Sequence, residues 1–309
     1  MRRIIGIGET VLDLIFKDGQ PQAAKAGGSM LNSVVSMGRM KLPVSFISEY
    51  ALDDVGDLVD SFLKANGVDT SAVYRFRNGK TALALAFLNE KNDARYTFYK
   101  DYPPDRLNTS FPPTGPDDII LCGSFYSIWS EIREKFLQFI GQAKQDGALI
   151  IYDPNFRASH LFELDRLKPL ILENMKLADI VRGSNEDFIY LFSTGNIEEA
   201  YKAVKTYCSR LVYTASDQGV YIRTSSFSAA YPVARIEPVS TIGAGDNFNA
   251  GMITSLYQQE IRKTQIDSLK ADQWKQIAEM AVDFATHVCM SYDNYISPAF
   301  AEEMRKKKG

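Results

Sequence analysis

The sequence contains few cysteines and histidines and no long hydrophobic run. Its 309 residues include three cysteines, none of them in a CxxC pair, and two histidines. This scarcity excludes a disulfide framework and argues against a structural zinc site. No stretch approaches the roughly 18 apolar residues that span a bilayer, and the opening MRRIIGIGE lacks the apolar core of a signal peptide. We therefore expect a cytoplasmic protein that does not contact a membrane.

The sequence also lacks an excess of charge of one sign. It has 35 Lys and Arg residues against 38 Asp and Glu residues, a net charge of −3. Nucleic-acid-binding proteins usually carry a basic stripe, whereas the basic run here is confined to residues 305–308. We expect no nucleic-acid partner. The hydrophobic content of 45% is typical of a globular protein with a large core.

The chain does contain a regular alternation of strand-like and helix-like segments. The strand-like runs are Arg3–Gly8, Val44–Glu49, Ile119–Cys122, Ala148–Asp153, Ile180–Arg182 and Leu211–Thr214. Helical patterns lie between most of them, at Met30–Met40, Asp54–Asn66, Glu131–Gln145 and Glu198–Cys208. This order predicts an α/β fold in which helices cover both faces of a mostly parallel sheet. Because no linker or repeat divides the chain, we predict a single domain over residues 1–309.

Two regions interrupt the alternation, because each holds two strand-like runs with no helix between them. These runs are Val11–Phe16, Gln22–Ala24, Ala82–Leu88 and Arg95–Tyr99. Turn-forming residues at 89–93 join the second pair. We predict that the two hairpins, over about residues 11–25 and 82–99, form a small separate sheet that acts as a lid over a cleft. Edge hairpins without a functional role are the alternative.

The most informative motif is a run of small residues that leads into an acid. Gly243, Ala244 and Gly245 precede Asp246, and apolar residues then recur every four positions from Phe248. The first amides of a helix lack partners within it and carry the positive end of its dipole, so they can bind a phosphate or an oxyanion. An acid beside them is placed to take a proton from an alcohol. The motif thus indicates phosphoryl transfer to a hydroxyl, and an ordinary capped helix start is the alternative.

Three residues near the N-terminus could hold a polyol. Gly28, in a Gly-Gly pair, allows a ligand to approach the backbone, and Asn32 follows one turn into the next helix. The amide of Asn32 both donates and accepts hydrogen bonds, as a sugar hydroxyl requires. Asp13 interrupts an apolar run, so its carboxylate must face water or a partner. A capped loop and an outward-facing acid remain the alternatives for these residues.

Two cations are candidates to neutralise phosphate charge. Arg157 follows a buried strand run in the segment Asp153–Arg157, and Lys100 follows the last lid strand. Ligands in open α/β sheets bind beyond the carboxyl ends of the strands, where Arg157 falls. Either cation could equally lie on the surface. Two other phosphate motifs fail, because a Walker A loop would need glycine at Tyr74 and a dinucleotide fingerprint would need glycine at Val11.

With these segments in order, the sequence resembles the ribokinase-like (PfkB) family of carbohydrate kinases over essentially its whole length. Gly27 and Gly28 followed by Asn32 resemble the N-terminal signature of the family. Thr241 followed by the run 243–246 resembles its more specific C-terminal signature. Within the family, residues 8–13 and 153–157 most resemble the fructokinase and ketodeoxygluconate kinase branch.

The resemblance implies an ATP-dependent kinase with a Rossmann-like α/β/α core and a small β-sheet lid. It implies that Asp246 is the general base, that the amides of 243–246 form the anion hole, and that Asp13, Gly28 and Asn32 bind the sugar. It also implies Mg²⁺ as a cofactor. Because the lid often forms the dimer contact in this family, we expect a homodimer.

The resemblance also implies an ATP site in which this chain departs from the family pattern. Ser184 and the loop Thr214–Gly219 match positions near the nucleotide, but Ser216 replaces a glycine in that loop. Asp187 stands where the family has a glutamate that reaches magnesium through water, so its reach is shorter. Ser240 replaces the usual aspartate, which leaves the need for a monovalent cation open.

The sequence as a whole predicts a kinase that uses ATP and Mg²⁺ to phosphorylate a hydroxyl of a fructose-like ketose or a sugar acid. An adenosine-type nucleoside kinase is the alternative within the same class. A sugar- or nucleotide-sensing protein without turnover is the alternative from another class, suggested by Ser216 and Asp187.

Overall fold

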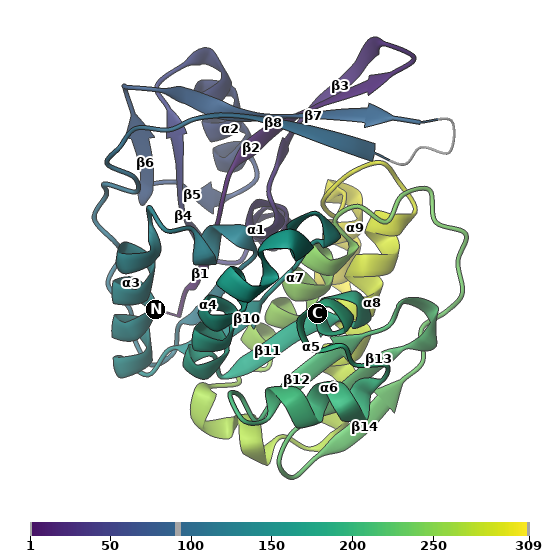
Figure 1. Ribbon diagram of the computed structural model, residues 1–309. Helices are drawn as coiled ribbons and strands as arrows, with labels where there is room; N and C mark the ends of the chain where they lie inside the picture. The colour runs from purple at the N-terminus through teal and green to yellow at the C-terminus, as the bar shows by residue number, and fades with distance from the viewer. Residues whose placement is uncertain (1, 90–93, 308–309) are drawn as a thin grey trace.

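The computed structural model describes residues 2–89 and 94–307, in which ten strands form one sheet and four form another (Figure 1). The larger sheet has the order β14-β13-β12-β11-β10-β9-β1-β4-β5, with β6 paired to β4. Its strands are β1 (Ile4–Ile7), β4 (Val44–Ala51), β5 (Val68–Asp69), β6 (Val73–Phe76), β9 (Ile119–Gly123), β10 (Leu149–Asp153), β11 (Ile180–Ser184), β12 (Leu211–Thr214), β13 (Val220–Arg223) and β14 (Ser228–Tyr231).

The larger sheet reverses its direction of growth at β1. The strands from β4 to β12 are parallel to their neighbours, and only β13 and β14 pair antiparallel. The chain adds β4, β5 and β6 on one side of β1 and then β9 to β12 on the other. Such a topological switch point leaves a crevice beyond the carboxyl ends of the two central strands, where α/β proteins bind ligands.

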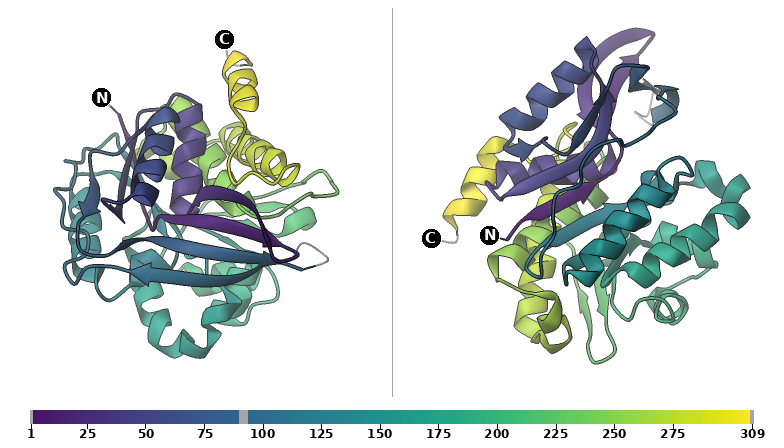
Figure 2. Two further views of the ribbon diagram at one scale, coloured as in Figure 1. Left: turned by 90° about the horizontal axis from the view of Figure 1, so that it is seen from above. Right: turned by 90° about the vertical axis from the view of Figure 1, so that its left-hand side faces the viewer.

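Helices cover both faces of this sheet (Figure 2), as the alternation predicts. Neighbouring strand residues point to opposite faces, so Ile4 packs in one apolar cluster and Ile5 in the other. One cluster includes α1 (Ser29–Arg39), α2 (Asp54–Ala65), α7 (Ala244–Gln258), α8 (Ala271–Cys289) and α9 (Pro298–Lys306). The other includes α3 (Arg133–Gln145), α4 (Leu164–Leu177), α5 (Asn185–Phe192) and α6 (Ile197–Val204).

The four strands predicted as hairpins form the separate small sheet, seen at the top of Figure 1. It has the order β3-β2-β7-β8, in which the two antiparallel hairpins are joined through the parallel pair β2–β7. Its strands are β2 (Val11–Lys17), β3 (Gln20–Gly27), β7 (Lys80–Leu88) and β8 (Ala94–Asp101). Of the turn predicted at 89–93, residues 90–93 lie outside the described part of the chain.

Several elements escaped the sequence analysis. The short strands β5, β6, β13 and β14 were not predicted, and neither were the helices α4, α5, α8 and α9. Of these, α4 carries Pro169 inside it. Proline removes a helical hydrogen bond, so it weakens the local signal without preventing a helix that packs firmly. No helix in residues 2–89 and 94–307 combines the length and apolarity needed to cross a membrane.

Candidate active site

A cleft of about 1430 Å³ lies beyond the carboxyl ends of the parallel strands and extends to the small sheet. Its walls include Glu9 after β1, Asp13 on β2, Thr214 at the end of β12 and the first turn of α7. A pocket for one small molecule usually measures roughly 300–1,000 Å³. The cleft is therefore large enough for two small ligands side by side.

Small residues keep the start of α7 open to this cleft. Gly243 caps the helix with φ of 78°, and a Cβ at this position would lie 2.9 Å from the main-chain oxygen of Asn294. The amide of Ala244 donates to Thr241 O at 3.3 Å, and the helical bonding then begins with Asn247 N to Gly243 O at 2.9 Å. The amides of residues 245 and 246 precede that bond, and both residues line the cleft. The turn thus has the form of an anion site.

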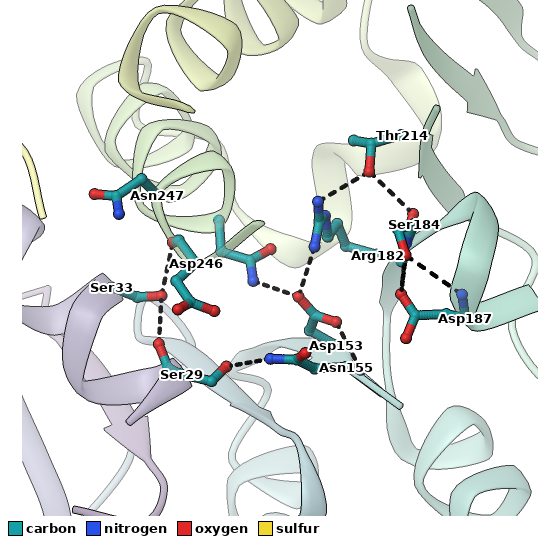
Figure 3. A network of polar contacts seen from close by, with 12 residues as sticks. Ser29, Ser33, Asp153, Asn155, Arg182, Ser184, Asp187, Thr214, Asp246 and Asn247 are labelled. Atoms are coloured by element: carbon teal, nitrogen blue, oxygen red, sulfur yellow. Dashed lines mark hydrogen bonds and ion pairs between the residues drawn. The ribbon is translucent and has the colours of Figure 1, made fainter. Parts of the chain in front are cut away.

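Asp246 lies in this first turn, with 6% of its surface exposed (Figure 3). Asn32 Nδ2 on α1 donates to its Oδ2 at 2.8 Å, and Ser33 Oγ donates to its main-chain oxygen at 2.7 Å. Burial raises the pKa of the Asp246 carboxyl to about 6, against the opposing effects of Asn32 and the nearby Arg157. The carboxylate is thus ionised at neutral pH and still basic enough to accept a proton.

Asn32 faces the cleft and is also buried. It lies one turn into α1, as the sequence indicated, but its side chain bonds to Asp246 and is only 5% exposed. Its Oδ1 has no hydrogen-bond partner among the described residues. A buried amide oxygen without a partner is unfavourable, so this atom is available to a ligand hydroxyl.

Asp13 and the Gly27–Gly28 pair meet at the small-sheet side of the cleft. The Asp13 carboxylate lies against Gly27, where any Cβ would collide with it. Burial raises the pKa of Asp13 to about 7, and the charge of Lys25 opposes the rise. Gly28 has φ of 128°, and a Cβ there would collide with the main-chain oxygen of Glu9. Glycine is thus required at Gly28 by its positive φ and the close main chain, and a side chain at Gly27 would displace the Asp13 carboxylate.

The structure places the two predicted cations differently. Lys100 lines the cleft, but its Nζ lies 2.7 Å from Glu9 Oε1 and 4.6 Å from the centre of the Trp129 ring. Its charge is therefore already paired. The Arg157 side chain is exposed, has no hydrogen bond or ion pair within the described part of the chain, and is near enough to lower the pKa of Asp246. Arg157 is the cation that remains available to an incoming anion.

Sequence reasoning missed a buried ion pair beneath the first turn of α7. Arg182 Nη1 on β11 lies 2.9 Å from Asp153 Oδ2 at the end of β10, and Arg182 Nη2 donates to Thr214 Oγ1 at 2.9 Å (Figure 3). Asn249 Nδ2 on α7 also donates to Asp153 Oδ2, at 2.6 Å. A Cβ at Gly245 would lie 2.9 Å from Arg182 Nη1. The sequence does offer a sign of this ion pair, because Arg182 stands in the apolar run of β11, where a buried charge needs a partner.

Asp187 and Ser184 form the capping box of α5. Asp187 Oδ2 accepts from both N and Oγ of Ser184 at 2.7 Å, and its Oδ1 accepts from Phe156 N at 2.6 Å. Burial and the nearby Asp153 raise the pKa of Asp187. Among the residues that the structure describes, no group of three or more His, Cys, Asp or Glu side chains could hold a metal ion. The predicted indirect contact of Asp187 with magnesium therefore stays a prediction.

The predicted nucleotide loop follows β12 and lines the cleft. Ser216 has φ of 47° and Gly219 has φ of 119°. Serine in the left-handed region is less favourable than glycine, so the departure at Ser216 places a strained residue where glycine would relax. Beyond the loop the cleft becomes apolar, with Val220, Ile236 and Val282 among the residues that line it. A flat heterocycle could pack against this surface.

Comparisons with known proteins agree on one family. The model of the pfkB family carbohydrate kinases matches residues 1–291. The chain is 26% identical to fructokinase-1 of Oryza sativa subsp. japonica over 268 residues, which cover 82% of this chain and 83% of that protein. It is 27% identical to the fructokinase of Rhizobium leguminosarum bv. trifolii over 275 residues, which cover 86% and 83%.

Solved structures share the fold at lower identity. The chain superposes on aminoimidazole riboside kinase from Salmonella enterica, solved with aminoimidazole riboside and an ATP analog, with a TM-score of 0.84 at 18% identity over 99% of both chains. Fructokinase from Vibrio cholerae, in a form with fructose, ADP and a calcium ion, gives a TM-score of 0.83 at 21% identity over 98% of both chains.

Proposed function

The chain belongs to the pfkB family of carbohydrate kinases, and from this premise we propose that it uses ATP and Mg²⁺ to phosphorylate a hydroxyl of a fructose-like ketose or a sugar acid. The observation that carries the proposal is Asp246, a buried carboxylate with a pKa raised to about 6 beside the open first turn of α7. A base and an anion site within one helical turn are what phosphoryl transfer to an alcohol requires.

Asp246 acts as the general base in this proposal. Its carboxylate takes the proton of the acceptor hydroxyl as that oxygen attacks the terminal phosphorus of ATP, and ADP leaves. The amides at residues 245 and 246 and the positive end of the α7 dipole stabilise the charge on the transferring group. The Arg157 side chain, exposed and unpaired in the described chain, adds a positive charge to the wall of the cleft.

Asp13 and Asn32 hold the acceptor. The Asp13 carboxylate and the unpartnered Oδ1 of Asn32 both accept hydrogen bonds, and both residues line the cleft. Two acceptors on different elements bind neighbouring hydroxyls of a polyol and orient one of them toward Asp246.

The residues at the other end of the cleft fit ATP. The first turn of α7 and the loop residues Thr214, Ser216 and Gly219 line this end of the cleft and offer polar groups to phosphates, and the apolar surface beyond accepts a base. Mg²⁺, when bound, neutralises phosphate charge. Because both oxygens of Asp187 already accept protein hydrogen bonds, the ion would be held chiefly by phosphate oxygens, with Asp187 behind a water molecule.

An adenosine-type nucleoside is the second candidate acceptor. The aromatic side chains of Tyr96, Phe98 and Phe125 line the cleft toward the small sheet. Aromatic rings stack well on planar bases, so this wall favours an acceptor that carries a base as well as a sugar.

We also propose a homodimer formed through the small sheet. On β8, Tyr96 and Phe98 line the cleft, whereas Tyr99 lies on the opposite face of the strand and exposes 57% of its surface. A large exposed aromatic side chain outside the cleft is typical of a protein interface. Sedimentation at several concentrations should show a dimer that Tyr99→Ser weakens, and a monomer at all concentrations would contradict the proposal.

The decisive test of function is ADP release from Mg·ATP over a panel of ketoses, aldoses, sugar acids and nucleosides. We expect turnover with a ketose or a sugar acid, and loss of that turnover in Asp246→Asn. If a nucleoside is the best substrate, the second candidate is the function. No turnover with any acceptor, together with calorimetric binding of a sugar or nucleotide, would instead select the sensing protein.

A further inference from the structure

Lys25 connects the small sheet to the loop between α8 and α9. It lies on β3, and its Nζ donates to the main-chain oxygen of Tyr292 at 2.6 Å and to Asp293 Oδ1 at 2.9 Å. The Lys25 side chain is 18% exposed, whereas that of Asp293 is 55% exposed. A second bond runs between the same segments, from Tyr295 Oη to Ala26 O at 3.4 Å. The strand is thus docked on the loop at two successive residues.

The same loop supports the turn at the start of α7. Asn247 Nδ2 donates to Asn294 O and to Gly243 O, both at 2.8 Å. The backbone of Asn294 also packs so closely on Gly243 that a Cβ there would lie 2.9 Å from Asn294 O. Any shift of this loop is therefore transmitted to the amides beside Asp246.

Lys25 also lies beside Asp13, which lines the cleft. In the β2–β3 pair its Cα lies directly opposite that of Asp13. Opposite residues of an antiparallel pair project from the same face of the sheet. The ammonium is bound by the α8–α9 loop, and its charge is near enough to lower the pKa of the Asp13 carboxyl.

We propose that Lys25 is a positioning residue of the kinase, which lies across the β2–β3 pair from Asp13 and holds the sugar-binding strands against the loop that supports the first turn of α7. This role rests on the proposed function, because Asp13 must bind the acceptor and the α7 turn must bind the phosphoryl group. Asp293 and the carbonyl of Tyr292 accept hydrogen bonds from the ammonium, so that this one side chain links the small sheet to the α8–α9 loop.

The test compares Lys25→Met, which keeps the chain length and removes the charge, with Lys25→Arg, which keeps the charge. Lys135→Met is the matched control, because Lys135 Nζ likewise donates to an aspartate, Asp105, at 2.9 Å and to a carbonyl, that of Arg106, at 2.7 Å. Wild-type turnover on the acceptor panel is measured first, since its absence would refute the proposed function and not this role.

The sugar KM is then measured between pH 6 and 9. The titratable groups that act on Asp13 are Lys25 on β3, Tyr96 on β8 and Tyr295 in the α8–α9 loop. Both tyrosines stay neutral in this range, because burial raises the pKa of each. Loss of the lysine charge raises the pKa of Asp13, so at pH 7 less of the carboxylate is ionised. We expect Lys25→Met to raise the sugar KM about tenfold at pH 7, with recovery toward pH 9.

Amide exchange gives a readout that does not depend on turnover. Lys25→Met should speed exchange in residues 290–296 and 243–247, whereas Lys25→Arg and Lys135→Met should leave it near that of the wild type. A sugar KM within twofold of the wild type at every pH would overturn the proposal. An increase in the sugar KM that does not depend on pH, and that Lys25→Arg or Lys135→Met also shows, would overturn the proposal as well. Such an increase would reflect a loss of stability and not the loss of the lysine charge.

Discussion

Burial disfavours the charged form of Asp246, the proposed general base, and thereby makes its carboxylate more basic. Asp246 is 6% exposed, and its pKa of about 6 lies above the ordinary value of 3.8. A carboxyl group whose pKa rises on folding adds no penalty below its unfolded pKa and destabilises the fold above its folded pKa. At neutral pH the buried charge of Asp246 therefore lowers the free energy of unfolding, and the same burial keeps the carboxylate basic.

Asp246→Asn should lower turnover by roughly two to four orders of magnitude, the usual range for loss of a general base. The same change should raise the free energy of unfolding at pH 7 by about 1–3 kcal/mol, because it removes the buried charge. Kinetics and denaturant unfolding measure the two effects. Asp54→Asn is the matched control, since Asp54 is an exposed acid in the first turn of α2. Near-normal turnover in folded Asp246→Asn would remove this residue from its role.

The pH dependence should separate the two acids of the cleft. Protonation of Asp246 should lower kcat as the pH falls through about 6, and protonation of Asp13 should raise the sugar KM as the pH falls through about 7. Both effects lie on the acid side, because burial raises both pKa values and each carboxylate acts in its charged form. Initial rates from pH 5 to 8 test this, and a kcat that does not vary over that range would contradict it.

At the scale of elements, the first turn of α7 and the end of β11 are fitted to each other. Gly245 leaves room for the Arg182 guanidinium, which is pinned by Asp153 and Thr214 and lies 5.1 Å from the centre of the Phe248 ring. A buried arginine that keeps its partners needs little reorganisation when a further anion approaches. The geometry of the helix start thus depends on a strand that is distant in sequence.

Gly245→Ala should lower turnover by tenfold or more, because the new methyl group displaces Arg182 and weakens a charge-assisted hydrogen bond of about 1.5–3 kcal/mol. Gly141→Ala is the control, because Gly141 lies inside α3 with open space around it. That change should leave turnover intact and stabilise the protein by about 0.5–1 kcal/mol. Steady-state kinetics and thermal unfolding of both variants test this. Equal turnover in the two variants would show that the close packing of Gly245 on Arg182 does not matter for catalysis.

At the scale of the whole molecule, two sheets enclose the cleft. The small sheet contributes Asp13, Tyr96 and Phe98, while α7 on the larger sheet contributes Asp246 and the open first turn. A kinase must keep water from the terminal phosphate of ATP, or it hydrolyses ATP in place of phosphorylating its acceptor. A sheet that moves over the strand ends when the acceptor binds would exclude that water.

Binding of the best acceptor should therefore slow amide exchange in β2, β3, β7 and β8 more than in α8. The physical reason is that mobile covers come from the low-stability part of a structure, and a ligand that contacts them suppresses their opening. Hydrogen-exchange mass spectrometry with and without saturating acceptor makes the comparison. Equal protection in both states would identify the small sheet as a static wall or a fixed dimer contact.

The sequence by itself determined the features that depend on neighbours along the chain. Strand and helix periodicity gave the α/β fold and the two hairpins, because side-chain direction repeats every two or 3.6 residues. The run before Asp246 indicated an open helix start, because the unpaired amides of a first turn are a local property.

Only the tertiary structure decided which of these features meet. Asn32 bonds to Asp246 across 214 residues and Lys25 to Asp293 across 268, while Arg182 on β11 reaches Gly245 in α7. No local pattern encodes such pairs, since they follow from the order of the strands and from long-range packing. The same packing removes water from the carboxyls of Asp13 and Asp246 and so raises their pKa values. The sequence thus identified the candidate residues. Their partners depend on long-range packing and their pKa values on burial, and both are properties of the folded chain.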